Sequence, residues 1–260
     1  MTSLTHQGQP EHQSSTGARP AGVTDERTAA TSVQQMFDTI APRYDLLNHL
    51  LSVGLDRWWW SRAARVFRST LERPEAVALD MCCGTGDMTL ALQKYRSVIA
   101  QSAPILALDF SHQMLSRGAQ KFAAHNIIPI EADALHLPLA DNSVDLVTSA
   151  FGFRNLANYE EGLAELHRVL RPGGQIGILD CNQPDGFIGA LYNIYFKTIL
   201  PKLGGVISGN SRAYSYLPAS VERFPRPPRM LQLIAEAGFT NGTWTSYTFG
   251  TAGLYRGIKP

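Results

Sequence analysis

The sequence feature that most constrains the fold is the stretch from Val77 to Asp87, which reads Val-Ala-Leu-Asp-Met-Cys-Cys-Gly-Thr-Gly-Asp. A short apolar run ends in Asp80 and passes into a turn that contains Gly84 and Gly86, and an amphipathic helix is expected directly after it. Strand, glycine turn and helix in this order open a nucleotide-binding βαβ unit, in which glycines allow a tight turn and close approach of a ligand to the backbone. The stretch predicts an α/β sheet with a ligand at this turn.

The turn differs from a dinucleotide-binding loop. The third glycine of G-x-G-x-x-G falls on Thr89, and the carboxylate of Asp87 occupies the helix N-terminus where a pyrophosphate would need free N–H groups. An acid at this place suits a ligand whose local charge is positive or neutral. S-adenosyl-L-methionine (S-adenosylmethionine), with a sulfonium, an ammonium group and no phosphate, fits that description. The alternative is an ordinary strand-to-helix turn without a ligand.

Composition narrows the class of protein. The 260 residues suffice for one α/β domain of roughly 200 residues with appendages. A net charge of +1 argues against a nucleic-acid footprint. Cys82, Cys83 and Cys181 are odd in number and form no C-x-x-C, so they indicate reduced thiols rather than disulfides. The seven histidines lack metal-ligand spacing, and no metal site is expected. No secretory signal and no membrane span is predicted, which indicates a cytoplasmic enzyme.

Four regions are predicted along the chain. Residues 1–30 contain few large apolar groups and are expected to be a disordered tail, because they cannot bury enough surface to offset the entropy of ordering. Residues 31–260 form the main domain. Within it, residues 31–70 are an N-terminal helical cap, and residues 186–224 interrupt the α/β rhythm as a helical lid insertion, with an apolar helix expected over Phe187–Leu203.

The cap contains three consecutive tryptophans, Trp58, Trp59 and Trp60, in a helix that is predicted from Asp56 to about Phe67. Neighbouring residues on a helix point about 100° apart, so at least one ring must face away from the others. One interpretation is core packing with one half-exposed ring. The other is a lid over an apolar ligand or a contact with a membrane interface.

The sheet is predicted from regularly spaced apolar runs. Helices are expected between these runs, including one over residues 159–170, and a turn is expected at residues 171–174. The alternation predicts a doubly wound, Rossmann-like α/β sheet whose last strand is antiparallel. Its strands are expected at residues 76–79, 105–109, 127–130, 144–150, 175–180, 240–249 and 254–258.

Acids follow the first three predicted strands at Asp80, Asp109 and Asp133. In an open α/β sheet the ligand lies beyond the carboxyl ends of the strands. Asp109 lies 23 residues after Gly86, about where an acid reaches a ribose diol, and Asp133 is placed to meet an adenine edge. Any one of these acids could be a helix cap or a loop residue, but their shared register indicates an adenosyl ligand.

From Val33 to Lys259 the chain resembles the class I S-adenosylmethionine-dependent methyltransferases. More closely, it is similar to the menaquinone and ubiquinone biosynthesis C-methyltransferase family. The glycine turn is typical of the whole superfamily, whereas the first, third and fifth of the following motifs are specific to the family. The motifs are Tyr44-Asp45-Leu46-Leu47-Asn48 with Ser52, Gly54 and Trp59; Leu79 to Asp87; Phe151-Gly152-Phe153-Arg154-Asn155; Arg168 to Gly174; Tyr214-Ser215-Tyr216-Leu217; and Ala237-Gly238-Phe239.

The resemblance implies C-methylation of a polyprenyl naphthoquinol, the step from demethylmenaquinol to menaquinol or from demethylphylloquinol to phylloquinol. Alternatives are a polyprenyl benzoquinol in ubiquinone biosynthesis, another small acceptor, or a binding protein that has kept the cofactor pocket without activity. Tyr44 is expected to contact the substrate. The residues expected to bind the cofactor are Asp80, Gly84, Thr85, Gly86, Asp109, Phe110, Met114, Asp133, Ala134 and Ala150.

Some positions depart from the usual pattern of the family. Asp56 replaces a histidine, and Asp180 and Asn182 stand where much of the family has glutamate and serine. Asp180 and Asn182, with the double cysteine, resemble the plant and cyanobacterial branch that acts on a phytyl naphthoquinol. These residues favour a naphthoquinol ring for the acceptor and do not determine the type of its tail.

Arg154 and Asn155 are the residues expected to be catalytic. Methylation of a carbon ortho to a phenol needs electron density there, which ionising the phenol supplies. At pH 7 a phenol of pKa about 10 is ~3 units from ionised, a cost of about 4 kcal/mol, and a nearby cation recovers part of it. We assign charge stabilisation to Arg154, with Asn155 as a hydrogen-bonding partner, because arginine is too basic to act as an ordinary base. The base itself is left open, as water or an acid.

The expected acceptor also has consequences for partners. A polyprenyl tail must leave the bilayer at least in part, so weak peripheral contact with the inner face of the membrane is expected, through the apolar helix over Phe187–Leu203. No nucleic-acid partner is expected. The sequence leaves both a monomer and a homodimer open.

Overall fold

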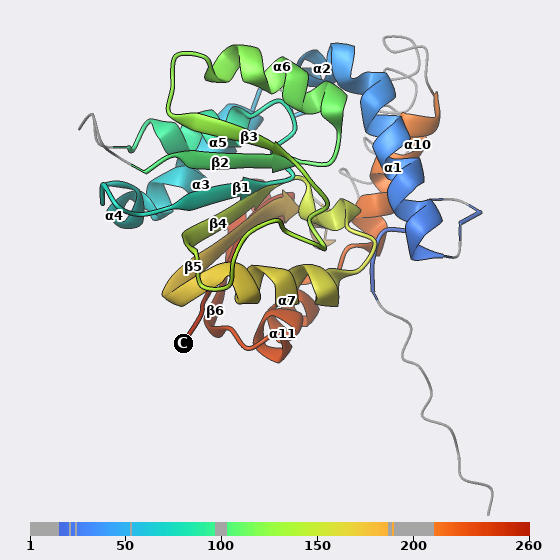
Figure 1. Ribbon diagram of the computed structural model, residues 1–260. Coiled ribbons are helices and arrows are strands. Elements are labelled where there is room, and N and C mark those ends of the chain that lie inside the picture. The colour runs from blue at the N-terminus through green and yellow to red at the C-terminus, as the bar shows by residue number, and fades with distance from the viewer. Residues whose placement is uncertain are drawn as a thin grey trace, which may run out of the picture.

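The computed structural model describes residues 16–20, 22–23, 25–52, 54–96, 103–186, 189 and 211–260. These residues form a seven-stranded sheet with helices on both faces, in the strand order β3-β2-β1-β4-β5-β7-β6 (Figure 1). The strands are β1 (Ala78–Met81), β2 (Ile105–Asp109), β3 (Ile127–Glu131), β4 (Val144–Ala150), β5 (Leu170–Cys181), β6 (Thr240–Tyr247) and β7 (Ala252–Ile258).

Strand directions confirm the doubly wound prediction. The pairs β1–β2, β2–β3, β1–β4 and β4–β5 are parallel, whereas β7 runs antiparallel to both β5 and β6. A 3₁₀ turn over Thr248–Gly250 joins β6 directly to β7. Because so short a connection can join only antiparallel neighbours, β7 returns between β6 and β5 and becomes the antiparallel last strand.

The helices cover the two faces unequally (Figure 1). Alternation along β1 sends Leu79 and Met81 into one core with α7 and α11, and Ala78 into the other core with α3, α5 and α6. Both faces are therefore buried, as expected for parallel strands. The helices on these faces are α3 (Asp56–Val66), α4 (Arg68–Leu71), α5 (Asp87–Gln93), α6 (His112–Phe122), α7 (Tyr159–Val169) and α11 (Pro227–Glu236).

Another group of helices lies at the carboxyl edge of the sheet, on the right in Figure 1. It comprises α1 (Glu26–Ile40), the 3₁₀ turn η1 (Ala41–Arg43), α2 (Tyr44–Leu51) and, close to α1, α10 (Ser211–Arg223). The helix α1 begins where the Asp25 carboxylate accepts a hydrogen bond from Thr28 N–H at 2.8 Å, and it ends just before Pro42. No helix among the described residues is long and apolar enough to cross a bilayer.

The expected tail boundary at residue 30 differs from the structure. Besides the early start of α1, residues 16–20 pack against the segment after β4, where Ala18 is buried and its N–H donates to Leu156 O at 2.7 Å. Arg19 Nη1 also donates to Ala157 O at 2.6 Å. Composition missed this contact because it rests on backbone hydrogen bonds rather than on large apolar side chains. Residues 1–15 lie outside the described part.

Two other boundaries also differ. The turn expected at residues 171–174 is part of β5, which starts at Leu170. Gly173 there has φ +80°, and the β4–β5 register shifts between Val144 and Leu146, so the glycines form an irregularity within the strand. Of the apolar helix expected over Phe187–Leu203, only Gly189 is among the described residues. The helix α10 lies in the C-terminal part of the expected lid insertion.

The three tryptophans divide as the core interpretation predicts. Trp59 and Trp60 are buried, whereas Trp58 is 47% exposed. The ring of Trp59 lies 5.7 Å from that of Phe151, at the end of β4. The helix α3 is therefore packed directly behind the carboxyl edge of the sheet.

The glycine turn yields a stability prediction. A Cβ at Gly86 would lie 2.2 Å from the Phe122 ring, and φ is +87°, whereas Gly173 has φ +80° and open space around it. Alanine should cost about 1–2 kcal/mol at either site through the left-handed backbone. Gly86→Ala should lose about 1–3 kcal/mol more through overpacking. Urea unfolding measures both, and equal losses in the two variants would contradict this packing.

Candidate active site

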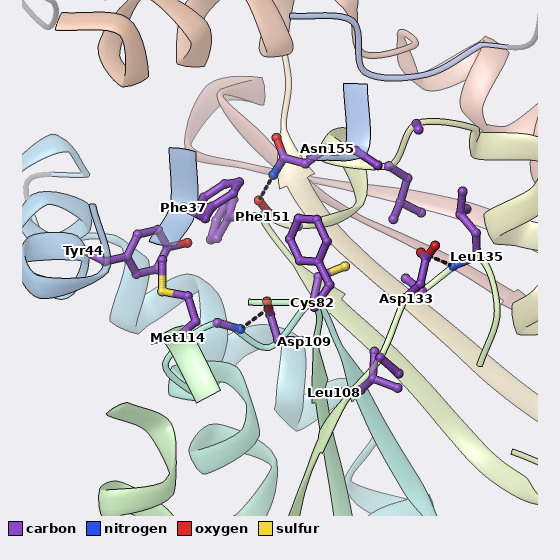
Figure 2. Close-up of a pocket in the computed structure, with 18 residues that line it drawn as sticks. Phe37, Tyr44, Cys82, Leu108, Asp109, Met114, Asp133, Leu135, Phe151 and Asn155 are labelled. Carbon is purple, nitrogen blue, oxygen red and sulfur yellow. Dashed lines mark hydrogen bonds between the residues drawn. The ribbon is translucent and has the colours of Figure 1, made fainter. Parts of the chain in front are cut away.

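The strand order reverses between β1 and β4, and a pocket lies beyond the carboxyl ends of the strands on both sides of this point (Figure 2). Open α/β sheets bind ligands at such a switch point. The pocket is lined by Ala30, Phe37, Tyr44, Cys82, Gly84, Leu108, Asp109, Phe110, Met114, Ala132, Asp133, Ala134, Leu135, Phe151, Gly152, Asn155, Leu156 and Ala157.

The two turns at the switch point are strained. Cys82 follows β1 with φ +55°, and Phe151 follows β4 with φ +58°, although neither is a glycine. The turns also approach each other closely, since a Cβ added to Gly152 would lie 2.4 Å from Cys82 Cβ. Strained backbone of this kind persists only where its surroundings hold it, and it clusters at ligand sites. Burial raises the pKa of the Cys82 thiol well above its usual value, so Cys82 is a neutral wall residue.

Asp109 anchors the glycine turn from the end of β2. Its carboxylate accepts hydrogen bonds from Gly84 N–H at 2.8 Å and from Ser111 N–H at 2.9 Å. Burial raises its pKa to about 6, against the opposing effect of these bonds. Each oxygen has a second acceptor site, so the carboxylate can hold the turn and also accept from a ligand in the pocket (Figure 2).

Asp80 lies fully buried on the other side of the turn. Thr89 Oγ1 donates to it at 2.6 Å and Thr148 Oγ1 at 2.9 Å. Burial raises the pKa of Asp80 to about 7. Asp80 faces a recess that adjoins the main pocket through Tyr44, Cys82 and Phe151. Thr85, Asp87 and Ala150 also line this recess.

Asp133 occupies the far end of the pocket, after β3. Its Oδ1 accepts from Leu135 N–H at 2.9 Å, and about half of its side chain is exposed (Figure 2). Much of the remaining pocket wall is apolar, with Phe110, Met114 and Leu135 among the lining residues. The pocket thus offers a few oriented carboxylate oxygens between apolar surfaces, which is typical of small-molecule sites.

The helix α1, which belongs to the predicted N-terminal helical cap, supplies one wall of the site. Gln34 Nε2 donates to Phe110 O at 2.7 Å, and Ser111 Oγ donates to Asp38 at 2.5 Å. These bonds dock α1 on the end of β2, and Ala30 and Phe37 then line the pocket. Phe37 belongs to the apolar stripe of this helix, but periodicity alone cannot say which partner a stripe faces.

The negative charge of Asp87 is paired with a lysine of the same chain, Lys121. Lys121 Nζ lies 3.1 Å from Asp87 and 2.7 Å from Asp45, whose other oxygen accepts from Thr85 Oγ1 at 2.5 Å. At the sequence level, Asp87 at the helix N-terminus predicts a ligand whose local charge is positive or neutral. In the structure, Lys121 supplies the positive charge and ties α2 to the glycine turn.

Arg154 is buried beside the pocket and is not among the lining residues. Its Nη1 donates to Asp180 Oδ1 at 2.7 Å and to Phe151 O at 2.5 Å, and its backbone N–H donates to Asp180 Oδ2. Burial opposes the charge, but the Asp180 carboxylate raises the pKa of Arg154 above its usual value. The guanidinium is therefore a charged group that fixes the end of β4.

Asn155 does line the pocket. Its Nδ2 donates to Phe151 O at a long 3.4 Å (Figure 2). Its Oδ1 accepts from the Tyr216 hydroxyl of α10 at 3.1 Å. Burial raises the pKa of Tyr216 to about 12, although Arg154 opposes this rise. The second N–H of the Asn155 amide remains able to donate to a ligand.

The predicted cofactor residues separate into three groups. Gly84, Asp109, Phe110, Met114, Asp133 and Ala134 line the main pocket, while Asp80, Thr85 and Ala150 line the recess. Tyr44 lines both. Gly86 lines neither, because its α-carbon faces the Phe122 ring. Leu135, Leu156 and Ala157 also line the main pocket, although none of them was predicted as a site residue.

Comparison with known proteins places this geometry in a class. The model of the ubiE/COQ5 methyltransferase family matches residues 23–259. A demethylmenaquinone methyltransferase of Deinococcus radiodurans is 44% identical over 240 residues, covering 91% of this chain and 96% of the relative. The relative of the same name in Thermus thermophilus is 45% identical over 228 residues, or 86% and 100% of the two chains.

Solved structures agree on the fold. An S-adenosylmethionine-dependent methyltransferase of Thermotoga maritima has a TM-score of 0.62 at 16% identity, over 88% of this chain and all of that one. The [4+2]-cyclase SpnF has a TM-score of 0.64 at 16% identity, over 95% and 99% of the two chains. The fold is thus that of the Rossmann-like S-adenosylmethionine-dependent methyltransferases. By the extent of its family match and relatives, the chain belongs to the ubiE/COQ5 methyltransferase family.

The buried Asp80 yields a pH prediction. Its folded-state pKa of about 7 lies above the unfolded value of 3.8, so its contribution is fully present below pH ~4 and is lost as the pH rises towards 7. Asp80→Asn keeps the shape without the charge. The stability of the wild type relative to Asp80→Asn should fall by up to about 4 kcal/mol between pH 4 and 7. Urea unfolding across this range measures the difference, and a pH-independent difference would contradict the raised pKa.

Proposed function

We propose that the main pocket binds the adenosine of S-adenosylmethionine and that the recess receives its methionine end. Asp109 would accept from the ribose hydroxyls through its second acceptor sites, and Asp133 would meet the adenine edge. Asp80 and Thr85 line the recess, where the buried carboxylate suits the ammonium group of the methionine. The observation that carries the proposal is the position of Asp109, which holds the glycine turn and lines the pocket.

The acceptor that we propose is a polyprenyl naphthoquinol, with demethylmenaquinol as the first candidate. Two relatives at 44% and 45% identity, aligned over nearly their full length, bear the name demethylmenaquinone methyltransferase. A relative of Geotalea daltonii, 39% identical over 236 residues, bears the name ubiquinone/menaquinone biosynthesis C-methyltransferase, so a benzoquinol is the second candidate. On this proposal the protein acts in the cytoplasm at the inner face of the membrane that holds the quinol.

When bound, S-adenosylmethionine supplies an electrophilic methyl group. The protein must position the acceptor carbon and favour its phenolate. Positioning can contribute ~7–11 kcal/mol, and stabilising the phenolate can recover part of the roughly 4 kcal/mol that ionisation costs. We propose that the free N–H of Asn155 donates to the phenolate oxygen. Arg154 acts through its field and by holding the Phe151 carbonyl, because its guanidinium is buried and bound to Asp180.

The function is tested by methyl transfer from labelled S-adenosylmethionine to a demethylated naphthoquinol, with a benzoquinol of the same tail as the matched substrate. We expect transfer to carbon of the naphthoquinol, with kcat/KM for the benzoquinol at least about tenfold lower, because the smaller ring fills less of the site. Equal or faster turnover of the benzoquinol would reverse the ring assignment. Cofactor binding without transfer to either quinol would overturn the proposed reaction.

The role of Asn155 is tested by kinetics. Asn155→Ala should lower kcat about 10- to 1000-fold, while calorimetry shows near wild-type affinity for S-adenosylmethionine, because the lost bond forms in the transition state. Tyr216→Phe is the matched control, since it removes only the hydroxyl that binds Asn155 Oδ1, and its loss of kcat should be much smaller.

Arg154→Lys belongs in the same series. Arg154→Ala would leave the buried Asp180 carboxylate without its cationic partner, at a cost of about 3–5 kcal/mol in stability, whereas lysine retains the charge. Partial activity is expected for Arg154→Lys because lysine lacks the planar fork. For Asn155→Ala, a wild-type kcat would contradict the proposed hydrogen bond from Asn155 to the phenolate.

A further inference from the structure

Several large apolar side chains are exposed on one part of the surface, where α3 meets the turn between β6 and β7. Leu55 is 39% exposed, Trp58 47% and Phe249 78%. Leu55 and Trp58 are three residues apart, so they lie on the same side of the helix start. Isolated exposed apolar residues need no explanation, but a group that includes two aromatic rings indicates an interaction surface.

The two parts of this group are held together by contacts. The Trp58 ring packs against the Tyr247 ring at 5.7 Å, and Trp59 Nε1 donates to Thr248 Oγ1 at 2.9 Å. These contacts fasten the turn to α3 just before Phe249. Phe249 has φ +57°, an unusual conformation for a bulky residue. A strained backbone therefore presents this ring to the outside instead of to the core.

The same surface is positively charged. Arg57, Arg62 and Arg65 of α3 are exposed, and none has a carboxylate partner among the described residues. The acid of this helix, Asp56, is buried and bound to His49. Arg62 lies over the Trp58 ring, 5.3 Å from its centroid. Since the whole chain carries only +1, this concentration of arginines is local.

The surface borders the candidate active site. The turn that contains Phe249 leads into Ala252, which pairs with Cys181 at the carboxyl end of β5. Behind Trp58, the Trp59 ring packs on Phe151, which lines both the main pocket and the recess. A planar partner bound to this surface would therefore lie beside the carboxyl ends of the strands, where the candidate site is located.

We propose that Leu55, Trp58 and Phe249, together with Arg57 and Arg62, form a docking surface for an anionic phospholipid bilayer. Aromatic rings partition into the interfacial layer of a membrane, and arginines next to them bind the anionic head groups. The surface rests on the proposed function in one respect, that the acceptor is a lipid quinol. Docking then brings the candidate site close to the membrane that holds this acceptor.

Vesicle binding tests the proposal with the full-length chain. Phosphatidylcholine vesicles with and without phosphatidylglycerol are floated with the wild type, with Trp58→Ser/Phe249→Ser and with Ile128→Ser, in which an equally exposed apolar residue of β3 is changed as a control. We expect binding that depends on phosphatidylglycerol. The double variant should bind at least about tenfold more weakly, and Ile128→Ser should bind like the wild type.

The contribution of the Arg62 charge to binding and the depth to which Trp58 enters the bilayer are measured in separate experiments. Arg62→Gln should weaken binding about fivefold, whereas Lys94→Gln, at the exposed C-cap of α5, should not. Brominated lipids should quench the tryptophan fluorescence of the wild type and of Trp244→Phe, but much less that of Trp58→Phe. Quenching that survives in Trp58→Phe, or a double variant that binds like the wild type, would overturn the proposal.

A short-tailed, water-soluble quinol separates this inference from the proposed function. Trp58→Ser/Phe249→Ser should methylate it at the wild-type rate and lose rate only on vesicle-borne quinol. If the wild type methylates the soluble quinol but does not bind vesicles, the docking surface is wrong and the function stands. If it binds vesicles through this surface but transfers no methyl group, the function fails instead. A wild-type dimer that the double variant abolishes, with vesicle binding unchanged, would assign the surface to a second copy of the chain.

Discussion

The carboxylate of Asp109 joins the parts on which the site depends. It accepts from Gly84 N–H in the glycine turn and from Ser111 N–H at the start of α6, and the Ser111 hydroxyl donates to Asp38 of α1. One buried acid thus connects the end of β2, the turn after β1 and the helix that walls the pocket. Because burial raises its pKa to about 6, it lies close to its ionisation point near neutrality. A cationic ligand in the pocket would favour its charged form.

The site also combines strain with compensation. Cys82 and Phe151 adopt left-handed backbone conformations at the switch point, and the Arg154–Asp180 pair beneath them holds the Phe151 carbonyl. Such a buried ion pair is weak evidence for stability, since its desolvation cost rivals its attraction. Its geometric effect is clearer, because it fixes the turn that carries Asn155 into the pocket. On the proposed mechanism, Asn155 contacts the acceptor and Arg154 lies behind Asn155. Arg154 can therefore influence the reaction through its charge although it is buried.

Much of the scaffold was predictable from local patterns. β2 and β4 begin and end at the residues expected from their apolar runs, and the acids that follow the strands are short-range features of the same pattern. Other features depend on contacts between distant segments. The docking of residues 16–20 on Leu156 and the pairing of Lys121 with Asp87 each join chain segments that no local window contains together. The family resemblance supplied Asn155 as a candidate, but only packing separated it from Arg154.

By itself the sequence determined the doubly wound sheet, its antiparallel last strand, the glycine turn and the acids at the strand ends, because periodicity and turn chemistry act within a few residues of one another. The tertiary structure decided which of those groups face the pocket. It turned Gly86 towards Phe122, buried Arg154 against Asp180, brought Phe37 into the wall and set Trp58 beside the turn that presents Phe249. The physical reason is that the direction of a side chain depends on the partner it packs against, and that partner is chosen by the assembled sheet.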